Sequence, residues 1–375
     1  MIHSETTVVV MVGAVESDQG PVAWVERARR AAARDLLRQL GEIPGIDRLI
    51  LMTPVVGELA ENSGSLSVEH VASEPGPIHM GQTLARLVTD RKLARLLYLG
   101  GASAPLMSAG ELAGIVDRLN QAERLVISNN RYASDWAGVT PASALVDVAE
   151  RLPRDNMLGW VLSTESGLPS ESLPPSAASR LDIDTPGDLL VLKLHPDVQP
   201  ALRALLQKLP LDSSRLELAI DILRTPASRV FVAGRIGPQV WADLNGATQC
   251  WFRVMAEERG MVSSGRQERG EVYSLLAAHI EQVGVTRFFG EMPAWADAAF
   301  IDTRVLLAHH SVWPSDEDRF ASDLGLVAEI SDPWLRAFTE AAVAAPIPVI
   351  LGGHSLLVGD LLAICQILRS KAGDG

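Results

Sequence analysis

The most informative stretch of the sequence runs from residue 181 to residue 189 and reads Leu-Asp-Ile-Asp-Thr-Pro-Gly-Asp-Leu. Side chains alternate along an extended segment, so Asp182 and Asp184 are expected to point the same way. Two carboxylates on one face can hold Mg²⁺ or Mn²⁺, which are hard cations that take oxygen ligands and bridge to phosphates. Thr185 can cap a following helix with Pro186 at its first position, and this explains both residues without a ligand. The stretch predicts a helix start and, at Asp182 and Asp184, a candidate metal site.

Strand-like and helix-like runs alternate along nearly the whole chain of 375 residues. The β-branched run at 8–12 is typical of a strand buried on both faces, and the alternation predicts an α/β fold with mainly parallel sheets. Length favours two domains, since single domains usually hold about 100–200 residues. We therefore expect two Rossmann-like lobes, 1–196 and 225–375, joined by a helical linker over 197–224.

Composition limits the partners of the chain. It carries 33 Lys and Arg against 46 Asp and Glu, a formal charge of −13, and an acidic surface repels nucleic-acid backbones. We find no secretory signal and no run of about 20 uninterrupted apolar residues, so we expect no membrane partner. The two cysteines, Cys250 and Cys365, are expected to be buried thiols in a reducing compartment. These features predict a cytoplasmic protein with a small-molecule ligand and leave its oligomeric state open.

Polar and small residues follow two predicted strands of the first lobe. Ligands of open α/β sheets bind at the carboxyl ends of strands, where missing side chains allow close approach of the backbone. Asparagine side chains there can contact a sugar or base, an arginine can bind a phosphate and an aspartate can help to hold a cation. The alternative for the asparagines is a turn in which they bond to their own backbone. The candidate ligand-binding residues of this lobe are Gly100, Gly101, Ser103, Asn129, Asn130, Arg131 and Asp135.

The 181–189 stretch resembles the Asp-x-Asp-Thr-Pro-Glu-Asp segment of GT-A-type nucleotidyltransferases, which include molybdenum-cofactor and 2-phospho-lactate guanylyltransferases. The order of strands and helices also matches over roughly residues 1–194. The resemblance implies a lobe that binds a nucleotide or nucleotide-sugar with Mg²⁺ or Mn²⁺ and transfers a nucleotidyl group to a small phosphorylated acceptor. It also predicts that Asp182 lies beside the end of the strand at 96–99.

Two features depart from the family's pattern. The loop that follows the first strand, residues 13–20, contains Glu16 and Asp18 but no Arg or Lys that could grip phosphates. Ala102 or Ser103 stands where the family has an aspartate that binds the metal. Enzymatic activity therefore stays open, and two alternatives are a catalytically degenerate lobe that binds a metabolite or partner protein, and chemistry located in the C-terminal lobe.

The second lobe offers a candidate anion site. The loop at 264–270 carries Arg266 and Arg269 and precedes a predicted helix, whose free N–H groups favour anions. His354 and Ser355 follow the last predicted strand, where the histidine can act as an acid, a base or an anion ligand. We predict an anion between this loop and the turn at 352–355.

A second metal hypothesis concerns the adjacent histidines His309 and His310 together with Asp302. Residues 299–307 are expected to form a strand, in which adjacent side chains point to opposite faces. At most one of the two histidines is then expected to join a site.

Overall fold

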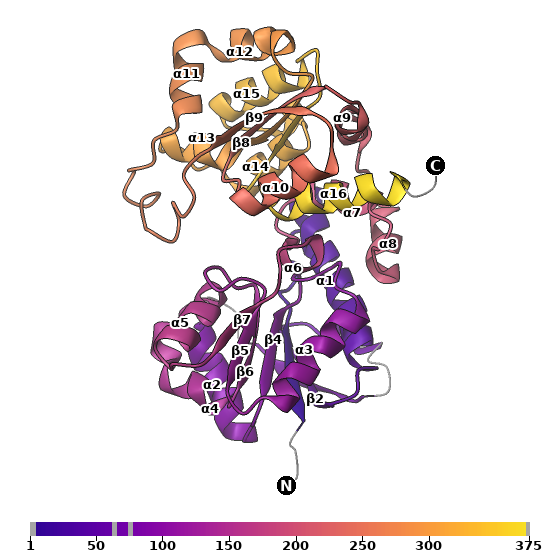
Figure 1. The fold of residues 1–375 in the computed structure, drawn as a ribbon, viewed down its shortest axis with the longest axis vertical. Helices are drawn as coiled ribbons and strands as arrows, with labels where there is room; N and C mark the ends of the chain where they lie inside the picture. The colour runs from indigo at the N-terminus through magenta and orange to yellow at the C-terminus, as the bar shows by residue number, and fades with distance from the viewer. Residues whose placement is uncertain (1–4, 62–65, 74–77, 373–375) are drawn as a thin grey trace. The chain divides into compact units, whose positions relative to one another are not determined.

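The computed structural model describes residues 5–61, 66–73 and 78–372, which fold into two compact units (Figure 1). The first unit comprises Met1–Glu16, Glu26–Asp182 and Gln199–Leu205, and the second comprises Ser17–Val25, Ile183–Val198 and Leu206–Gly375. Within the described residues, no helix is long and apolar enough to cross a membrane.

The first unit contains a mixed seven-stranded sheet in the order β3-β2-β1-β4-β6-β5-β7. Its strands are β1 (Thr6–Met11), β2 (Ile46–Thr53), β3 (Val68–Ala72), β4 (Leu96–Gly100), β5 (Leu125–Ser128), β6 (Trp136–Thr140) and β7 (Ser170–Ser172). Its helices are α1 (Gly20–Leu40, which begins in the second unit), α2 (Met80–Arg91), α3 (Ala109–Gln121), α4 (Ser143–Asp147), α5 (Leu158–Thr164), α6 (Ala177–Arg180) and α8 (Pro200–Leu206).

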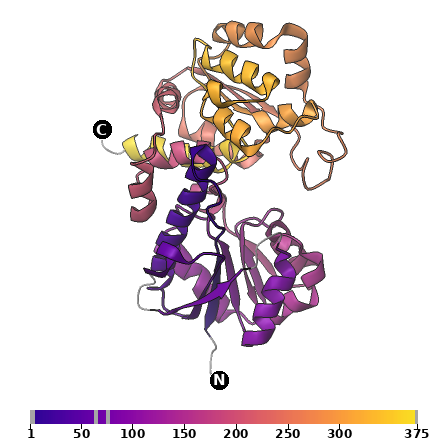
Figure 2. The same cartoon turned by 180° about the vertical axis from the view of Figure 1, so that it is seen from behind.

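Alternating side chains of these strands build two cores, one on each face of the sheet. Val8 and Val10 pack with Leu97, Leu99 and the apolar sides of α1 and α3. Val9 packs on the opposite face with α2, α4 and α5 (Figure 2). The first unit is therefore a three-layer α/β/α structure, and the predicted α/β class is confirmed.

Two strands of this sheet, β6 and β7, were not expected from the sequence. Strand β6 runs antiparallel to both β4 and β5 and makes the sheet mixed. The reversal follows from the side chain of Asn129, whose Oδ1 accepts the backbone N–H of Asp135 at 3.0 Å and so closes the turn before Trp136. Trp136 is fully buried in the core that packs against α1 and α3.

The second unit contains a four-stranded parallel sheet in the order β11-β10-β8-β9. Its strands are β8 (Arg229–Gly234), β9 (Trp251–Ala256), β10 (Ala298–Asp302) and β11 (Val349–Gly352). Its helices are α7 (Pro186–Leu194), α9 (Ser214–Arg224), α10 (Pro238–Ala247), α11 (Leu275–Val283), α12 (Val285–Glu291), α13 (Thr303–His309), α14 (Asp316–Asp323), α15 (Pro333–Val343) and α16 (Gly359–Ala372).

Phe231, Ile301 and Leu351 of this sheet pack against α11, α12 and α15. Helix α9 contacts β10 and β11, and α16 contacts α7, α9 and α10. The second sheet is therefore parallel and covered by helices.

Two predictions of secondary structure are wrong. The stretch 197–223, expected to be continuously helical, holds two helices, α8 and α9, separated by residues 207–213, because Pro210 cannot continue a helix. The expected strand at 299–307 ends at Asp302, whose carboxylate accepts the backbone N–H of Arg304 at 3.2 Å and begins helix α13.

Candidate functional site

The first unit has its topological switch point between β1 and β4, since β2 and β3 lie on the other side of β1. Ligands of open α/β sheets bind at such a point, beyond the carboxyl ends of the strands. Gly101 lies there, and its N–H donates to Met11 O at 2.7 Å. A Cβ atom added to Gly101 would lie 2.7 Å from Val12 Cγ2, so only glycine allows the two strand ends to meet this closely. Gly100 lies one residue earlier, with space for a Cβ next to Asp135 O and the side chains of Ser103 and Tyr98.

Asp182 reaches this edge through an antiparallel bridge with Ser103. This confirms that Asp182 lies beside the end of β4. Asp182 is also one of three carboxylates, with Asp135 and Asp155, whose charges act on the hydroxyl of Tyr98. Burial raises the pKa of Tyr98 well above its usual value, and the three negative charges raise it further because they oppose ionisation. The Tyr98 hydroxyl donates to Asp155 Oδ2 at 2.9 Å.

Arg180, at the end of α6, is the cation that sequence reasoning missed at this edge. Its half-buried guanidinium lies close enough to Asp135 for the two charges to interact, while desolvation lowers the pKa of Arg180. Among the described residues, Arg180 Nε is buried without a hydrogen-bond partner. In the sequence, only its position just before the 181–189 stretch indicates that Arg180 lies near this edge.

The loop after β1 supplies no basic side chain, as the sequence indicates. Arg30 of α1 is close by but buried, and its guanidinium donates to the carbonyl oxygens of Gly13, Val55 and Val56 and to Glu58. Arg30 therefore ties together the chain after β1 and the chain after β2, and its donors are not available to a ligand.

The predicted polar loop 129–135 mostly satisfies itself. Asn129 is buried, and its Nδ2 donates to Asp135 Oδ2 at 2.6 Å. Asn130 Oδ1 accepts the N–H of Tyr132, and Arg131 donates to Ser163 Oγ while it packs over the Trp160 ring. The alternative of a self-bonded turn therefore describes both asparagines.

In the second unit, the switch point lies between β8 and β10. Arg235, just after β8, makes a bidentate ion pair with the fully buried Asp302 at the end of β10, with distances of 2.6 and 3.0 Å. The side chain of Asp302 lies where a Cβ atom of Gly234 would be, at 2.3 Å, so only glycine permits this pair to form. Burial alone would raise the pKa of Asp302. The positive charges of Arg235 and Arg304 outweigh this effect, and the pKa is lowered.

His354 follows β11 and lies within electrostatic reach of Arg235, Arg259 and Asp302. Desolvation, followed by the positive charge of Arg235, lowers the pKa of His354 to about 4. His354 is therefore a neutral imidazole near neutrality.

The two arginines predicted to bind an anion with His354 have other partners. Arg266 pairs with Glu258, and Arg269 pairs with Glu271 at 2.7 Å. The structure brings Arg259 close to His354 instead, and Arg266 is not among the charges that act on this histidine.

Ser355 lies next to a buried pair of carboxyl groups in the second unit. Asp188 Oδ2 accepts the backbone N–H groups of Asp184 and Thr185 at 2.7 and 2.6 Å, so it caps helix α7 as the sequence suggested. Asp188 and Asp360 are fully buried next to each other, and burial followed by their mutual repulsion raises the pKa of Asp360 well above the usual range. Asp184 belongs to this unit, whereas Asp182 belongs to the first.

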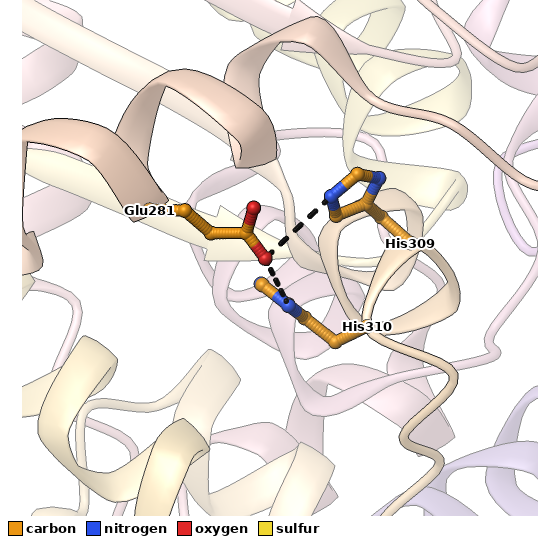
Figure 3. Close-up of side chains that lie close together, drawn as sticks. All are labelled: Glu281, His309 and His310. Carbon is orange, nitrogen blue, oxygen red and sulfur yellow. Dashed lines mark ion pairs between the residues drawn. The ribbon is translucent and has the colours of Figure 1, made fainter.

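His309, His310 and Glu281 form a cluster with the composition of a metal site (Figure 3). Both histidines lie at the end of helix α13 and approach the Glu281 carboxylate, at 3.7 and 3.2 Å, so the expectation that they point apart is wrong. His309 Nδ1 accepts the backbone N–H of Ser274 at 3.1 Å, which leaves the proton of the neutral ring on Nε2, the nitrogen that faces Glu281. A metal ligand needs a lone pair there and usually donates its other N–H, so the hydrogen bonds do not favour a metal centre at this cluster. Asp302 is bound to Arg235 and is not part of this cluster.

A pocket of about 380 Å³ lies elsewhere in the second unit, between the start of α9 and the chain that leads into β11. Aliphatic residues such as Ile347 and Ile350 line most of it, and the guanidinium of Arg215 at its wall donates to Ala342 and Val343 carbonyl oxygens. It does not contain the residues that gather at the strand ends, and we therefore place the candidate chemistry at the two sheet edges.

No family model and no curated protein matches the chain. Several solved structures are similar to about half of the chain. A cytidylyltransferase from Leptospira borgpetersenii is 17% identical with a TM-score of 0.40, over 55% of this chain and 93% of that one. A putative nucleotide-diphospho-sugar transferase from Desulfovibrio desulfuricans is 16% identical with a TM-score of 0.41, over 55% and 95%. A 4-diphosphocytidyl-2C-methyl-D-erythritol synthase from Anaerococcus prevotii is 10% identical with a TM-score of 0.31, over 46% and 87%. The similarity is distant, and we argue function from the residues of this chain.

Proposed function

We propose that the first unit binds a nucleotide or nucleotide-sugar together with a divalent cation, Mg²⁺ or Mn²⁺, at the carboxyl edge of its sheet. The observation that carries the proposal is the bridge between Ser103 and Asp182, which sets a carboxylate beside the glycine-lined end of β4. The site thus combines a floor without side chains, at Gly100 and Gly101, with charged groups at its rim.

The cation is proposed to bind to Asp182 and Asp135, the two carboxylates near Tyr98 that do not accept its hydroxyl hydrogen bond. Carboxylate oxygens are the ligands that Mg²⁺ and Mn²⁺ prefer, and these ions usually complete their shell with water and substrate phosphates. Ala102 or Ser103 stands where the family that the first unit resembles has a metal-binding aspartate, so Asp135 would supply the second carboxylate in this chain.

The cation is needed because the loop after β1 repels phosphates. Glu16 and Asp18 stand there, and Arg30 is occupied by backbone carbonyl oxygens. Arg180 is the nearest protein cation that we can assign to the edge, and one guanidinium cannot balance a triphosphate. We therefore expect the ion to provide most of the charge that holds the phosphates.

The reaction proposed for this site is nucleotidyl transfer to a small phosphorylated acceptor. An acceptor oxygen would bond to the α-phosphorus of a nucleoside triphosphate, and pyrophosphate would leave with the electron pair of the broken P–O bond. The alternative is a unit that binds the nucleotide or another metabolite without transferring any group.

Calorimetric titration with GTP, CTP and UTP tests the proposal. We expect binding with Mg²⁺ or Mn²⁺ that is largely lost in EDTA and in Asp182→Asn, whereas Asp117→Asn, on the exposed side of α3, should bind like the parent. Binding that persists unchanged in Asp182→Asn would refute the cation assignment. The absence of binding by all three nucleotides with either metal would reject the nucleotide proposal.

A further inference from the structure

The carboxyl edge of the second sheet has the framework of a ligand site. Strands β8, β9, β10 and β11 are all parallel, so their carboxyl ends, at Gly234, Ala256, Asp302 and Gly352, lie along one edge. The switch point of this sheet lies between β8 and β10, where an open parallel sheet forms its crevice.

A buried ion pair holds this framework in place. Asp302 binds the Arg235 guanidinium with both oxygens and also accepts the backbone N–H groups of Arg235 and Arg304, so four hydrogen bonds orient its carboxylate. Arg304 in turn makes a buried bidentate pair with Asp323, at 2.5 and 2.7 Å. Two guanidinium groups and two carboxylates thus cancel one another, and neither pair leaves a net charge.

Arg259 supplies the charge that is not cancelled. Its side chain is exposed beyond the end of β9, and within the described ranges it has no hydrogen bond or ion pair. Its Nη2 atom lies 3.6 Å from the position that a Cβ atom of Gly237 would take, so the guanidinium lies against the turn that begins helix α10.

His354 adds a neutral polar group to the same charges. Its ring is exposed and, among the residues that the structure describes, makes no side-chain hydrogen bond. A neutral imidazole offers one N–H donor and one acceptor, so it can bind an oxyanion without needing to be protonated.

We propose that Arg259 and His354 bind the phosphoryl group of a small metabolite at this edge, with the Arg235–Asp302 pair as its rigid base. The guanidinium presents a planar fork that suits two oxygens of an oxyanion. His354 follows a different strand end at the same sheet edge and would contact a further oxygen, which a tetrahedral phosphoryl group offers and a planar carboxylate does not. The acidic surface of the protein favours a small anion over a polyanionic chain.

The test is the binding of inorganic phosphate and pyrophosphate, followed by ³¹P NMR line width and calorimetry in EDTA, so that cation-dependent binding by the first unit is not measured. We expect Arg259→Ala to weaken binding about tenfold or more, because a hydrogen-bonded charge pair contributes about 1.5–3 kcal/mol. The affinity of Arg259→Lys for phosphate should lie between those of the parent and Arg259→Ala, because lysine keeps the positive charge but lacks the planar guanidinium. Citrate, a carboxylate probe, should bind more weakly than pyrophosphate.

The matched control is Arg336→Ala, which removes an exposed arginine from α15 of the same unit. It should bind phosphate like the parent. Equal binding by Arg259→Ala and the parent would overturn the proposal, as would an equal loss in both alanine variants, which would indicate attraction by surface charge alone. Asp182→Asn should leave this binding unchanged, so the outcome is independent of the function proposed for the first unit.

Discussion

The buried carboxyl groups of Asp188 and Asp360 make stability depend on pH in a direction that can be predicted. Asp188 Oδ1 and both carboxylate oxygens of Asp360 are buried without a hydrogen-bond donor among the described residues. A proton held between the two carboxyl groups supplies the missing donor, and two adjacent buried carboxylates cannot both ionise cheaply. Burial, followed by the charge of Asp184, raises the pKa of Asp188 from 3.8 to about 6.

The sign follows from proton linkage. The folded protein holds this proton more tightly than the unfolded chain, so the stability contributed by the pair is fully present below the unfolded pKa. The part that comes from Asp188 is lost as the pH rises through its folded pKa of about 6, and the part that comes from Asp360 is lost as the pH rises through the raised pKa of that group. The raised pKa of Asp188 alone corresponds to about 3 kcal/mol lost across this range.

Asp360→Asn is the informative perturbation, because the amide can donate to Asp188 Oδ1 without a titrating proton. We expect the variant to be at least as stable as the parent at about pH 8 and to gain stability relative to the parent as the pH rises from about 4.5 to 8, by up to about 1.4 kcal/mol per pH unit, because the raised pKa of Asp360 is absent from the variant whereas Asp188 titrates in both proteins. Urea unfolding followed by tryptophan fluorescence measures this, since five of the eight tryptophans lie between residues 241 and 334 of the second unit. The quantity to compare is the difference in free energy of unfolding between the variant and the parent at each pH, because the other carboxyl groups titrate in both proteins.

The control for this experiment is Glu340→Gln, which changes an exposed acid on α15 and should give a difference that is independent of pH. A constant difference for Asp360→Asn, or a variant that falls below the parent as the pH rises, would refute the shared proton.

Two further predictions concern the first unit. Arg30→Ala should lower the free energy of unfolding by about 2–4 kcal/mol, because it leaves the carbonyl oxygens of Gly13, Val55 and Val56 without their donor. Urea unfolding measures this change. A loss below about 1 kcal/mol would show that water replaces the guanidinium. Gly101→Ala should lower the free energy of unfolding by about 1–3 kcal/mol, because its Cβ would collide with Val12. Gly114→Ala on α3, where a Cβ atom meets nothing, should raise the free energy of unfolding by up to about 1 kcal/mol. The unfolding temperatures of the two variants should therefore shift in opposite directions.

The local chemistry of the chain predicts most of its elements. Ser108 and Glu111 have the spacing of a capping box, and the structure contains one, with the Glu111 side chain accepting the Ser108 N–H at 2.8 Å. The β-branched and apolar runs become β1, β2 and β4 because such residues suit a sheet covered on both faces. Strand β6 was missed because it follows a polar loop directly, and its antiparallel direction depends on the Asn129 side chain.

Site residues were harder to predict, because their partners are distant in sequence. The position of Asp182 could be inferred from a local motif and the order of strands. The pairing of Arg266 with Glu258 could not be inferred, since Glu258 lies on the other side of a loop whose path the sequence does not show. The same is true of Arg259, which looks like any other exposed arginine until Gly237 and His354 are placed near it.

The two sheet edges obey one topological rule but have opposite charge, and this difference separates their chemistry. The first edge gathers Asp135, Asp155 and Asp182 around a buried phenol, so a phosphate can bind there only if a cation comes with it. At the second edge, Asp302 and Asp323 are each matched by a guanidinium, and the charge of Arg259 is left over. A phosphate can bind there without a metal. Chelation of divalent ions is therefore expected to abolish binding at the first edge and to spare binding at the second, which makes the two sites separable in the intact chain without any substitution.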